Sequence, residues 1–397
     1  MSSSRIAACT LGFLVVLSFQ GMAQEAPPTM PAPTLVSLNV NDGVADAVFA
    51  ELSKQSNYPL VPFDERAWGN ALLPRVTVSL ENAPFWKAMR EVCAITGVTL
   101  YSSGSGDRHI MLMPVRQGRQ PNSMKCPAVF SGPFMLVAAS IQRSSYVDLS
   151  VPDKPNRNAG LTLVGYAEPK IKVVRTFYSA EVDEAVDEKG NSLLGPQAQG
   201  QRTVMAYGRV GTGSGLTWQM YVGLQTPPGT GEKIAKLRGK AKVSIQTKSE
   251  VLEIPDILKA EDVTKTVAGY TITFKKLTKT NDTLYSADIV LSREGGLDQQ
   301  QISELMTSPS ARLIDEQSGQ EYAGMTGGWG GGNIRVVVNN PGVRGGADAQ
   351  GGKQEIKLQF YARNRIAGAE PTKLVWEFTT EAQELAIPFE FTDLPLP

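Results

Sequence analysis

Histidine and cysteine are scarce in this chain, and their scarcity limits the chemistry it can support. The 397 residues include one histidine, His109, and three cysteines. A structural zinc site needs four nitrogen or sulfur ligands, so the composition argues strongly against one. His109 lies near no serine or cysteine motif, and no G-x-S-x-G sequence occurs, so a catalytic triad is not indicated. We interpret His109 as an ordinary surface or hydrogen-bonded residue and expect no cofactor.

The chain also lacks an excess of charge of either sign. It has 39 lysines and arginines against 39 aspartates and glutamates. No overall field would attract nucleic acid or an anionic membrane surface, so no nucleic-acid partner is expected. Apolar residues make up 42% of the chain, which is enough for hydrophobic cores, and the length is typical of two or three domains.

Long hydrophobic runs are missing except at the start. Leu11–Phe19 follows Arg5 and precedes the small residues Gly21 and Ala23, an arrangement typical of a secretory signal peptide over residues 1–23. No later segment approaches the ~20 apolar residues of a membrane helix, so no membrane insertion is expected after cleavage. The sequence therefore predicts export, to the periplasm, the cell envelope or the extracellular space.

Two cysteines would remain after cleavage, because only Cys9 lies in the signal peptide. Cys93 and Cys126 would then be in a compartment where disulfides form. A bridge between them would tie the end of one domain to the start of the next. Two unpaired buried thiols are the alternative.

The mature chain begins with a proline-rich segment, residues 24–34, which is typical of an extended linker. A strand-helix unit follows. Leu35–Val40 alternates like a half-buried strand, and Asn41 or Asp42 is placed to cap a helix. The apolar positions of that helix fall four residues apart, so they define a single buried face.

A second unit of the same kind starts with Val76–Leu80. Asn82 is its expected helix cap, Pro84 falls in the first turn, and Gly97 is expected to end the helix in the left-handed conformation. Residues 35–115 are therefore predicted to form a small α+β domain. The expected order is strand, helix, strand, strand, helix, strand, strand (βαββαββ).

This region resembles the short N-terminal (STN) domain of secretins and TonB-dependent receptors. The positions that carry the resemblance are Leu38, Val48, Leu52, Gln55, Val76, Val78, Leu80, Pro84, Thr96 and Gly97. The resemblance implies a domain that docks other envelope proteins and has no catalytic residues. Because the apolar helix face belongs to the core, the expected contact residues are Asp46, Glu51 and Lys54, together with the neighbouring sheet edge.

The rest of the chain is predicted to be all β. A polar linker, residues 116–126, precedes short β-rich runs separated by turn residues. We expect two β-sandwiches, residues 127–260 and 261–397, that resemble tandem immunoglobulin-like domains.

A weak internal repeat supports this division into two. Three pairs of segments match in order, at offsets between 128 and 136 residues. They align Phe134 with Tyr270, Asp187 with Asp315, and Pro255 with Pro388.

Two stretches could carry binding chemistry. Glu181–Glu188 holds five carboxylates, which is compatible with calcium, although a solvated edge strand is the simpler interpretation. Trp329 lies within the glycine run Gly327–Gly332, which could display it to a glycan.

The function predicted from the sequence is that of an exported, non-enzymatic envelope protein that docks other envelope proteins. A carbohydrate-binding protein that uses sandwich loops is the alternative. A hydrolase with an unrecognised carboxylate pair is a weaker third reading.

Overall fold

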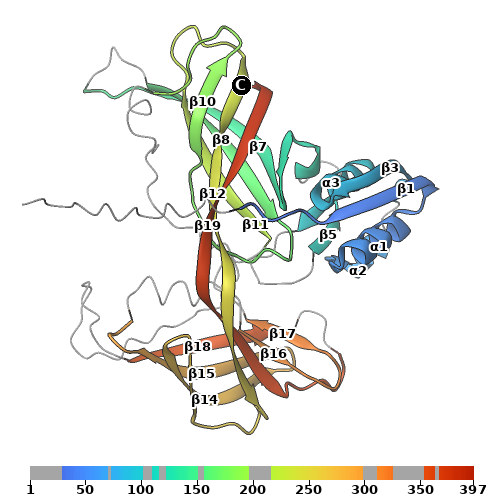
Figure 1. Ribbon diagram of the computed structural model, residues 1–397, viewed down its shortest axis with the longest axis vertical. Helices are drawn as coiled ribbons and strands as arrows, with labels where there is room; N and C mark the ends of the chain where they lie inside the picture. The colour runs from blue at the N-terminus through green and yellow to red at the C-terminus, as the bar shows by residue number, and fades with distance from the viewer. Residues whose placement is uncertain are drawn as a thin grey trace, which may run out of the picture.

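The structure is a computed structural model, and it describes residues 29–69, 73–101, 110–115, 122–150, 156–195, 216–297, 311–324, 353–362 and 366–397. The described part is mostly β. Two β lobes are stacked along the long axis and joined by a ribbon of two long strands, and a small α+β domain lies beside the first lobe (Figure 1).

The α+β domain contains the predicted elements in the predicted order, with one short extra helix. They are β1 (Leu35–Gly43), α1 (Ala45–Ser56), β2 (Leu60–Pro62), α2 (Glu65–Gly69), β3 (Val76–Pro84), α3 (Phe85–Thr96), β4 (Val98–Tyr101) and β5 (Ile110–Pro114). Strands β1 and β3 form one antiparallel pair, and β2, β5 and β4 form a second small sheet.

The two main helices begin differently from the prediction. Val44 and Pro84 occupy their N-cap positions, and neither side chain makes a capping hydrogen bond. Asp42 and Asn82 instead adopt positive φ angles of 53° and 47° within β1 and β3, where the pairing of these two strands shifts register. The predicted end of the second helix is confirmed, because Gly97 has φ 68° and its N–H donates to the carbonyl of Cys93.

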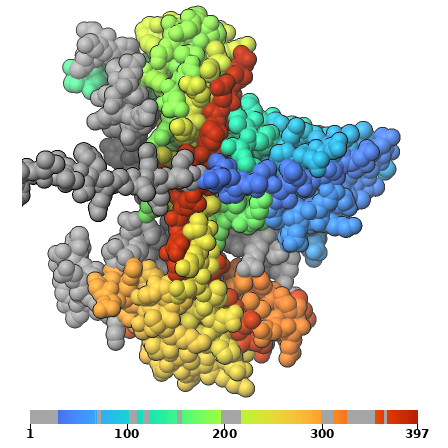
Figure 2. All heavy atoms as spheres, viewed as in Figure 1, coloured from blue at the N-terminus to red at the C-terminus, as the bar shows by residue number. Residues whose placement is uncertain are grey.

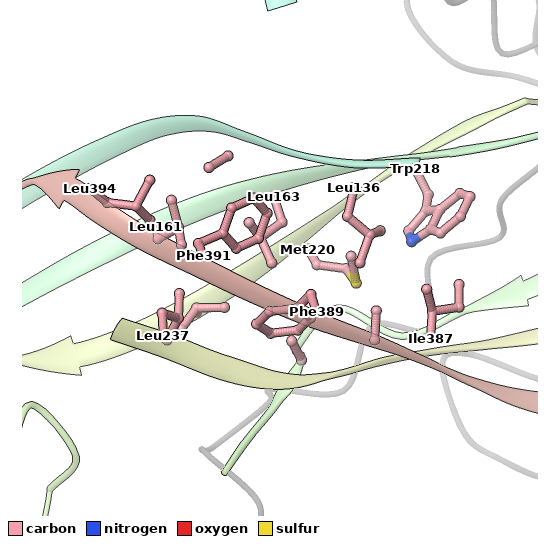
Figure 3. Packing of buried hydrophobic residues seen from close by; sticks show 14 of the residues in the cluster. Leu136, Leu161, Leu163, Trp218, Met220, Leu237, Ile387, Phe389, Phe391 and Leu394 are labelled. Carbon is pink, nitrogen blue, oxygen red and sulfur yellow. The ribbon is translucent and has the colours of Figure 1, made fainter. Parts of the chain in front are cut away.

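The first lobe packs two sheets face to face. One sheet has the order β11 (Thr217–Gln225), β8 (Asn156–Ala167), β7 (Phe134–Tyr146) and β6 (Ala128–Ser131). The opposing strands are β9 (Val173–Thr176), β10 (Glu181–Asp187), β12 (Lys233–Pro255) and β19 (Lys373–Pro395). Figure 3 shows Phe389, Phe391 and Leu394 of β19 packed between the sheets of this lobe.

The second lobe is related to the first, but its described strands belong to one continuous sheet. Its elements are β13 (Val263–Val267), β14 (Tyr270–Asn281), β15 (Leu284–Arg293), β16 (Ala311–Ile314), β17 (Glu321–Gly324) and β18 (Lys353–Tyr361). The order β18-β15-β14-β13 matches the order β11-β8-β7-β6, and β16 pairs the start of β19 as β10 pairs the start of β12. The matching order supports the predicted repeat.

The third sequence match of that repeat was misaligned. Pro255 and Pro395 end β12 and β19, so Pro395 rather than Pro388 is the counterpart of Pro255. Equivalent hydrogen bonds follow the two prolines. The N–H of Ile257, after β12, donates to the carbonyl of Thr372, just before β19, and the N–H of Leu396, after β19, donates to the carbonyl of Glu232, just before β12.

The strand order also differs from the immunoglobulin pattern. In that fold one sheet holds strands A, B, E and D and the other C, F and G, so no sheet has three consecutive strands side by side. Here β6, β7 and β8 lie side by side, as do β13, β14 and β15. The described strands form two related β lobes with a different connectivity.

The two long strands cross from one lobe to the other. Strands β12 and β19 pair from Lys233 opposite Pro395 to Pro255 opposite Lys373. The first half of β12 and the second half of β19 pack in the first lobe, and the remaining halves pack in the second. A boundary between 260 and 261 therefore does not separate the two cores, because Leu385–Leu396 lies in the first. Figure 2 shows the ribbon exposed between the lobes.

The α+β domain shares a core with the first lobe, and the adjoining segments are not free linkers. Helix α3 covers the outer face of the β7–β8 pair, where the rings of Trp86 and Tyr166 lie 5.6 Å apart. Met124, within the predicted linker 116–126, is fully buried. Met30, within the proline-rich segment, packs against the core of the first lobe.

Candidate functional site

The predicted docking residues lie on α1, which packs against β1, β2 and α3 and is at the lower side of the α+β domain in Figure 1. Asp46 is exposed but already has an internal partner, since it accepts a hydrogen bond from Nε1 of Trp68 at 2.9 Å. Trp68 in turn makes an edge contact with Phe49, with ring centroids 5.8 Å apart. Asp46 therefore holds α2 against α1.

Glu51 also has an internal partner. Its Oε1 accepts from Nε2 of Gln55 at 2.7 Å. Gln55 lies one turn further along α1, and its side-chain amide bonds both the N–H and the carbonyl of Ser37 in β1, each at 2.8 Å. Since a neighbouring strand would use the same two groups, Gln55 protects this edge of β1 against strand addition at Ser37.

Lys54 is the free member of the predicted group. It is exposed and makes no hydrogen bond or ion pair with any residue that the structure describes. Ala47 and Ala50 are also exposed on α1. We call Ala47, Ala50 and Lys54 the outer face of α1. A partner could contact this face without breaking an internal bond.

A buried carboxylate fixes the α+β domain in place. Glu168, which follows β8, is fully buried. It accepts from the N–H of Thr34 at 3.0 Å, the hydroxyl of Thr34 at 2.7 Å and the hydroxyl of Tyr58 at 3.0 Å, and Nζ of Lys170 lies 3.2 Å away. A buried carboxylate with this many donors is well compensated, and it links residues 110 and 134 positions away in sequence.

Tyr58 carries the electrostatic signature of this junction. The pKa of its hydroxyl is raised to about 12, mainly by burial and also by the nearby Glu168 carboxylate, while the hydrogen bond with Thr34 opposes the rise. The sequence did not reveal the junction. In the sequence, Glu168 is a polar residue directly before Pro169, which is typical of a turn, and no periodic pattern predicts that it is buried.

The acidic run Glu181–Glu188 is an edge strand whose charges are paired. Glu181 lies 2.7 Å from Lys242, and Glu184 lies 3.1 Å from Lys236. Asp187 is buried and accepts from the N–H groups of Lys189, Asn191 and Gly231. Across the described ranges, no cluster of three metal-ligating side chains occurs.

The two remaining cysteines are free thiols. Cys93 on α3 is fully buried and Cys126 is partly buried, and the structure has no bridge between them. Burial raises the pKa of both thiols, which keeps them protonated and poorly reactive. The bridge expected from the sequence is therefore not formed in this structure.

Several sequence predictions fall outside the described residues. Trp329 and the run Gly327–Gly332 are among them, as are His109 and the predicted signal peptide. In the described part of the chain, no helix is long and apolar enough to cross a membrane.

The chain matches no family model, and comparisons with curated proteins and with solved structures find no match either. The resemblance of residues 35–115 to STN domains therefore stays a prediction from the sequence.

Proposed function

We propose that this protein is an exported, non-enzymatic adaptor of the cell envelope, which binds a partner protein through the outer face of α1. The supporting observation is the attachment of the α+β domain. Helix α3 and Glu168 hold it against the first lobe, whereas α1 lies farther from that lobe than α3 does. A rigidly held helix face loses little conformational entropy when it binds, which favours affinity.

The structure supports a helix-face contact over strand addition to β1. Gln55 already occupies the main chain of Ser37, so an incoming strand would have to displace its amide. Docking on Ala47, Ala50 and Lys54 requires no such displacement. The STN likeness supplies the expectation that the partner is another envelope protein.

Substitutions on the surface test this proposal better than removal of the domain. Without residues 24–116, the apolar residues Met135, Val137 and Tyr166 would lose their cover and the first lobe would tend to aggregate. We therefore suggest Ala47→Arg with Ala50→Arg, which adds bulk to exposed positions. Lys276→Glu, at an exposed position of the second lobe, is the control.

The measurement is photo-crosslinking in envelope extract from a reactive group placed at position 54. A crosslinked partner that is lost in the double arginine variant and kept in the control variant supports the proposal. Partner recovery that is equal in all three proteins would refute it. Sequencing the N-terminus of the secreted chain tests export separately, with Gln24 expected first.

A further inference from the structure

The outer face of the β11-β8-β7 sheet has an unusual composition where α3 no longer covers it. Side chains alternate between the two faces of a strand. Because Leu161, Met220 and Ile141 face the core, their neighbours face outward. The outward positions beyond α3 include no charged residue. They carry Ser140, Gln142, Asn158, Thr162, Gln219 and Tyr221.

These residues form ordered rows across three strands. Tyr221 lies opposite Thr162, and Thr162 lies opposite Ser140. In the next row, Gly223 lies opposite Gly160, which lies opposite Gln142. Neighbouring rows on one face of a sheet are ~6.7 Å apart and neighbouring strands ~4.8 Å apart, so these hydroxyl and amide groups lie close together on one face.

Gly160 creates the space in which the tyrosine ring lies. A Cβ atom built on Gly160 would be 2.0 Å from the hydroxyl oxygen of Tyr221 and 2.5 Å from two of its ring carbons. The ring therefore rests directly on the glycine backbone. Tyr221 is nevertheless 51% exposed, so the remainder of the side chain is open to solvent. This is the geometry of a fixed aromatic platform.

The second lobe provides an internal comparison. Strands β18 and β15 are the counterparts of β11 and β8, and the pair equivalent to Tyr221 and Thr162 is Lys357 and Asp288. These two form an ion pair at 3.2 Å. The same face of the same fold is thus charged in one lobe and uncharged with an exposed aromatic ring in the other. The requirements of the fold alone do not explain the difference.

We propose that the face around Tyr221 binds a neutral glycan chain. The negative face of an aromatic ring attracts the polarised C–H groups of a sugar ring, and the surrounding amides and hydroxyls can both donate and accept hydrogen bonds to sugar hydroxyls. An uncharged face provides no partner for sulfates or uronates. A polar, uncharged face with the exposed ring of Tyr221 fits an extended neutral oligosaccharide best.

This site is distinct from the glycine-rich segment around Trp329 and does not depend on the outer face of α1. Three variants separate the contributions. Tyr221→Ala removes the platform, Tyr221→Phe keeps the ring, and Gly160→Ser displaces the ring while leaving it in the sequence. Lys357→Ala, at the equivalent position of the second lobe, is the matched control.

The experiment is titration calorimetry of the full chain with neutral hexasaccharides of glucose, xylose and N-acetylglucosamine, alongside heparin fragments and a proline-rich decapeptide. We expect at least one neutral hexasaccharide to bind. Tyr221→Ala and Gly160→Ser should each weaken it by about tenfold or more, whereas Tyr221→Phe, Lys357→Ala and Trp329→Ala should stay within about threefold. Thermal melting confirms that every variant is folded.

Three outcomes would overturn the proposal. The first is that no neutral hexasaccharide binds. The second is that Tyr221→Ala binds as tightly as the unmodified chain, or that Trp329→Ala alone abolishes binding. The third is a preference for heparin or for the proline-rich peptide. Each outcome leaves the proposed contact through α1 untouched, since that contact is tested by different variants.

Discussion

Glu377 and Lys172 form an ion pair at the point where the ribbon leaves the first lobe, with Oε2 and Nζ 2.9 Å apart. The other carboxylate oxygen of Glu377 accepts from Nε2 of Gln246 on the paired strand at 2.7 Å. Burial opposes ionisation of Glu377, but the bonds from Lys172 and Gln246 outweigh it and lower its pKa to about 2. Glu377 therefore braces the ribbon in its charged form.

Removing this brace should loosen the connection between the lobes. We expect Glu377→Ala to increase amide hydrogen exchange in residues 246–251 and to lower the free energy of unfolding by about 1–2 kcal/mol, because Lys172 and Gln246 lose a partly buried partner. The carboxylate is ionised at neutral pH. Its contribution should be present above its ordinary pKa of 4.5 and be lost as the pH falls towards 2.

The control for this prediction lies in the same ribbon. Lys248 and Glu381 are 3.1 Å apart, but both side chains are more than 60% exposed, at 65% and 62%. Glu381→Ala should leave both amide hydrogen exchange and the free energy of unfolding unchanged, since exposed ion pairs contribute little to stability. Equal effects of the two variants would contradict a special role for Glu377.

Each long strand contributes one half to each lobe. A substitution in such a strand should therefore destabilise the lobe in which the side chain is buried, whatever its position in the sequence. Phe391 lies six residues from the C-terminus but is buried in the first lobe, and Leu252 of β12 is buried in the second. We expect Phe391→Ala to lower protection from hydrogen exchange in β7 and β8, at a cost of about 3–5 kcal/mol. Leu252→Ala should instead lower protection in β14 and β15.

The opposite pattern of hydrogen-exchange protection would contradict this assignment of the strand halves to the two lobes. If Phe391→Ala lowered protection in β14 and β15 while β7 and β8 stayed protected, the last strand would belong to the second lobe in solution. Trp218 in the first lobe and Trp376 in the second provide a fluorescence readout of the same question.

The local part of this fold could be predicted from the sequence, and the long-range part could not. Alternation and helical spacing locate β1, α1, β3 and α3, because these signals depend only on neighbouring residues. Strand β12 alternates at both ends and is polar between Thr247 and Glu250. Such a pattern shows two buried halves but does not say which core each half enters. That choice depends on pairing with β19, more than a hundred residues away.

The candidate sites show the same limit. Position on a helix face predicted correctly that Asp46 and Lys54 are exposed, but the internal bonds of Asp46 and Glu51 depend on Trp68 and Gln55. Tyr221 was missed because a lone tyrosine in an alternating strand gives no sign of exposure. Gly160 and Gly223 lie opposite each other in β8 and β11. This pairing could not be recognised from the sequence, because it depends on the two strands being neighbours.

The two cysteines give a prediction that distinguishes free thiols from a bridge. In the native protein without reductant, Cys126 should react slowly with a thiol reagent and the buried Cys93 should not react. After unfolding, still without reductant, both should react in the processed chain. If neither thiol reacts after unfolding, the two are bridged in the protein, and the free thiols of this structure would be wrong.

The buried aspartates at the end of β10 and just after β16 should respond differently to substitution. Asp187 accepts four hydrogen bonds, including one from the N–H of Gly231 in the loop before β12, whereas Asp315 bonds mainly Gln317 and Ser318 within its own turn. We expect Asp187→Ala to destabilise the protein by about 2–4 kcal/mol, and Asp315→Ala by about half as much, because fewer donors lose their partner. Urea unfolding measures both.

Acid unfolding gives an independent check on Asp187. Burial raises its pKa, but the hydrogen bonds from Gly231 and Asn191 prevail and lower it to about 2, so the folded state holds the carboxylate ionised. Stability from this residue should be complete above its ordinary pKa of 3.8 and be lost as the pH falls towards 2. Asp187→Asn should flatten the dependence of stability on pH in this interval. A dependence as steep as that of the unmodified chain would show that other carboxylates control acid unfolding.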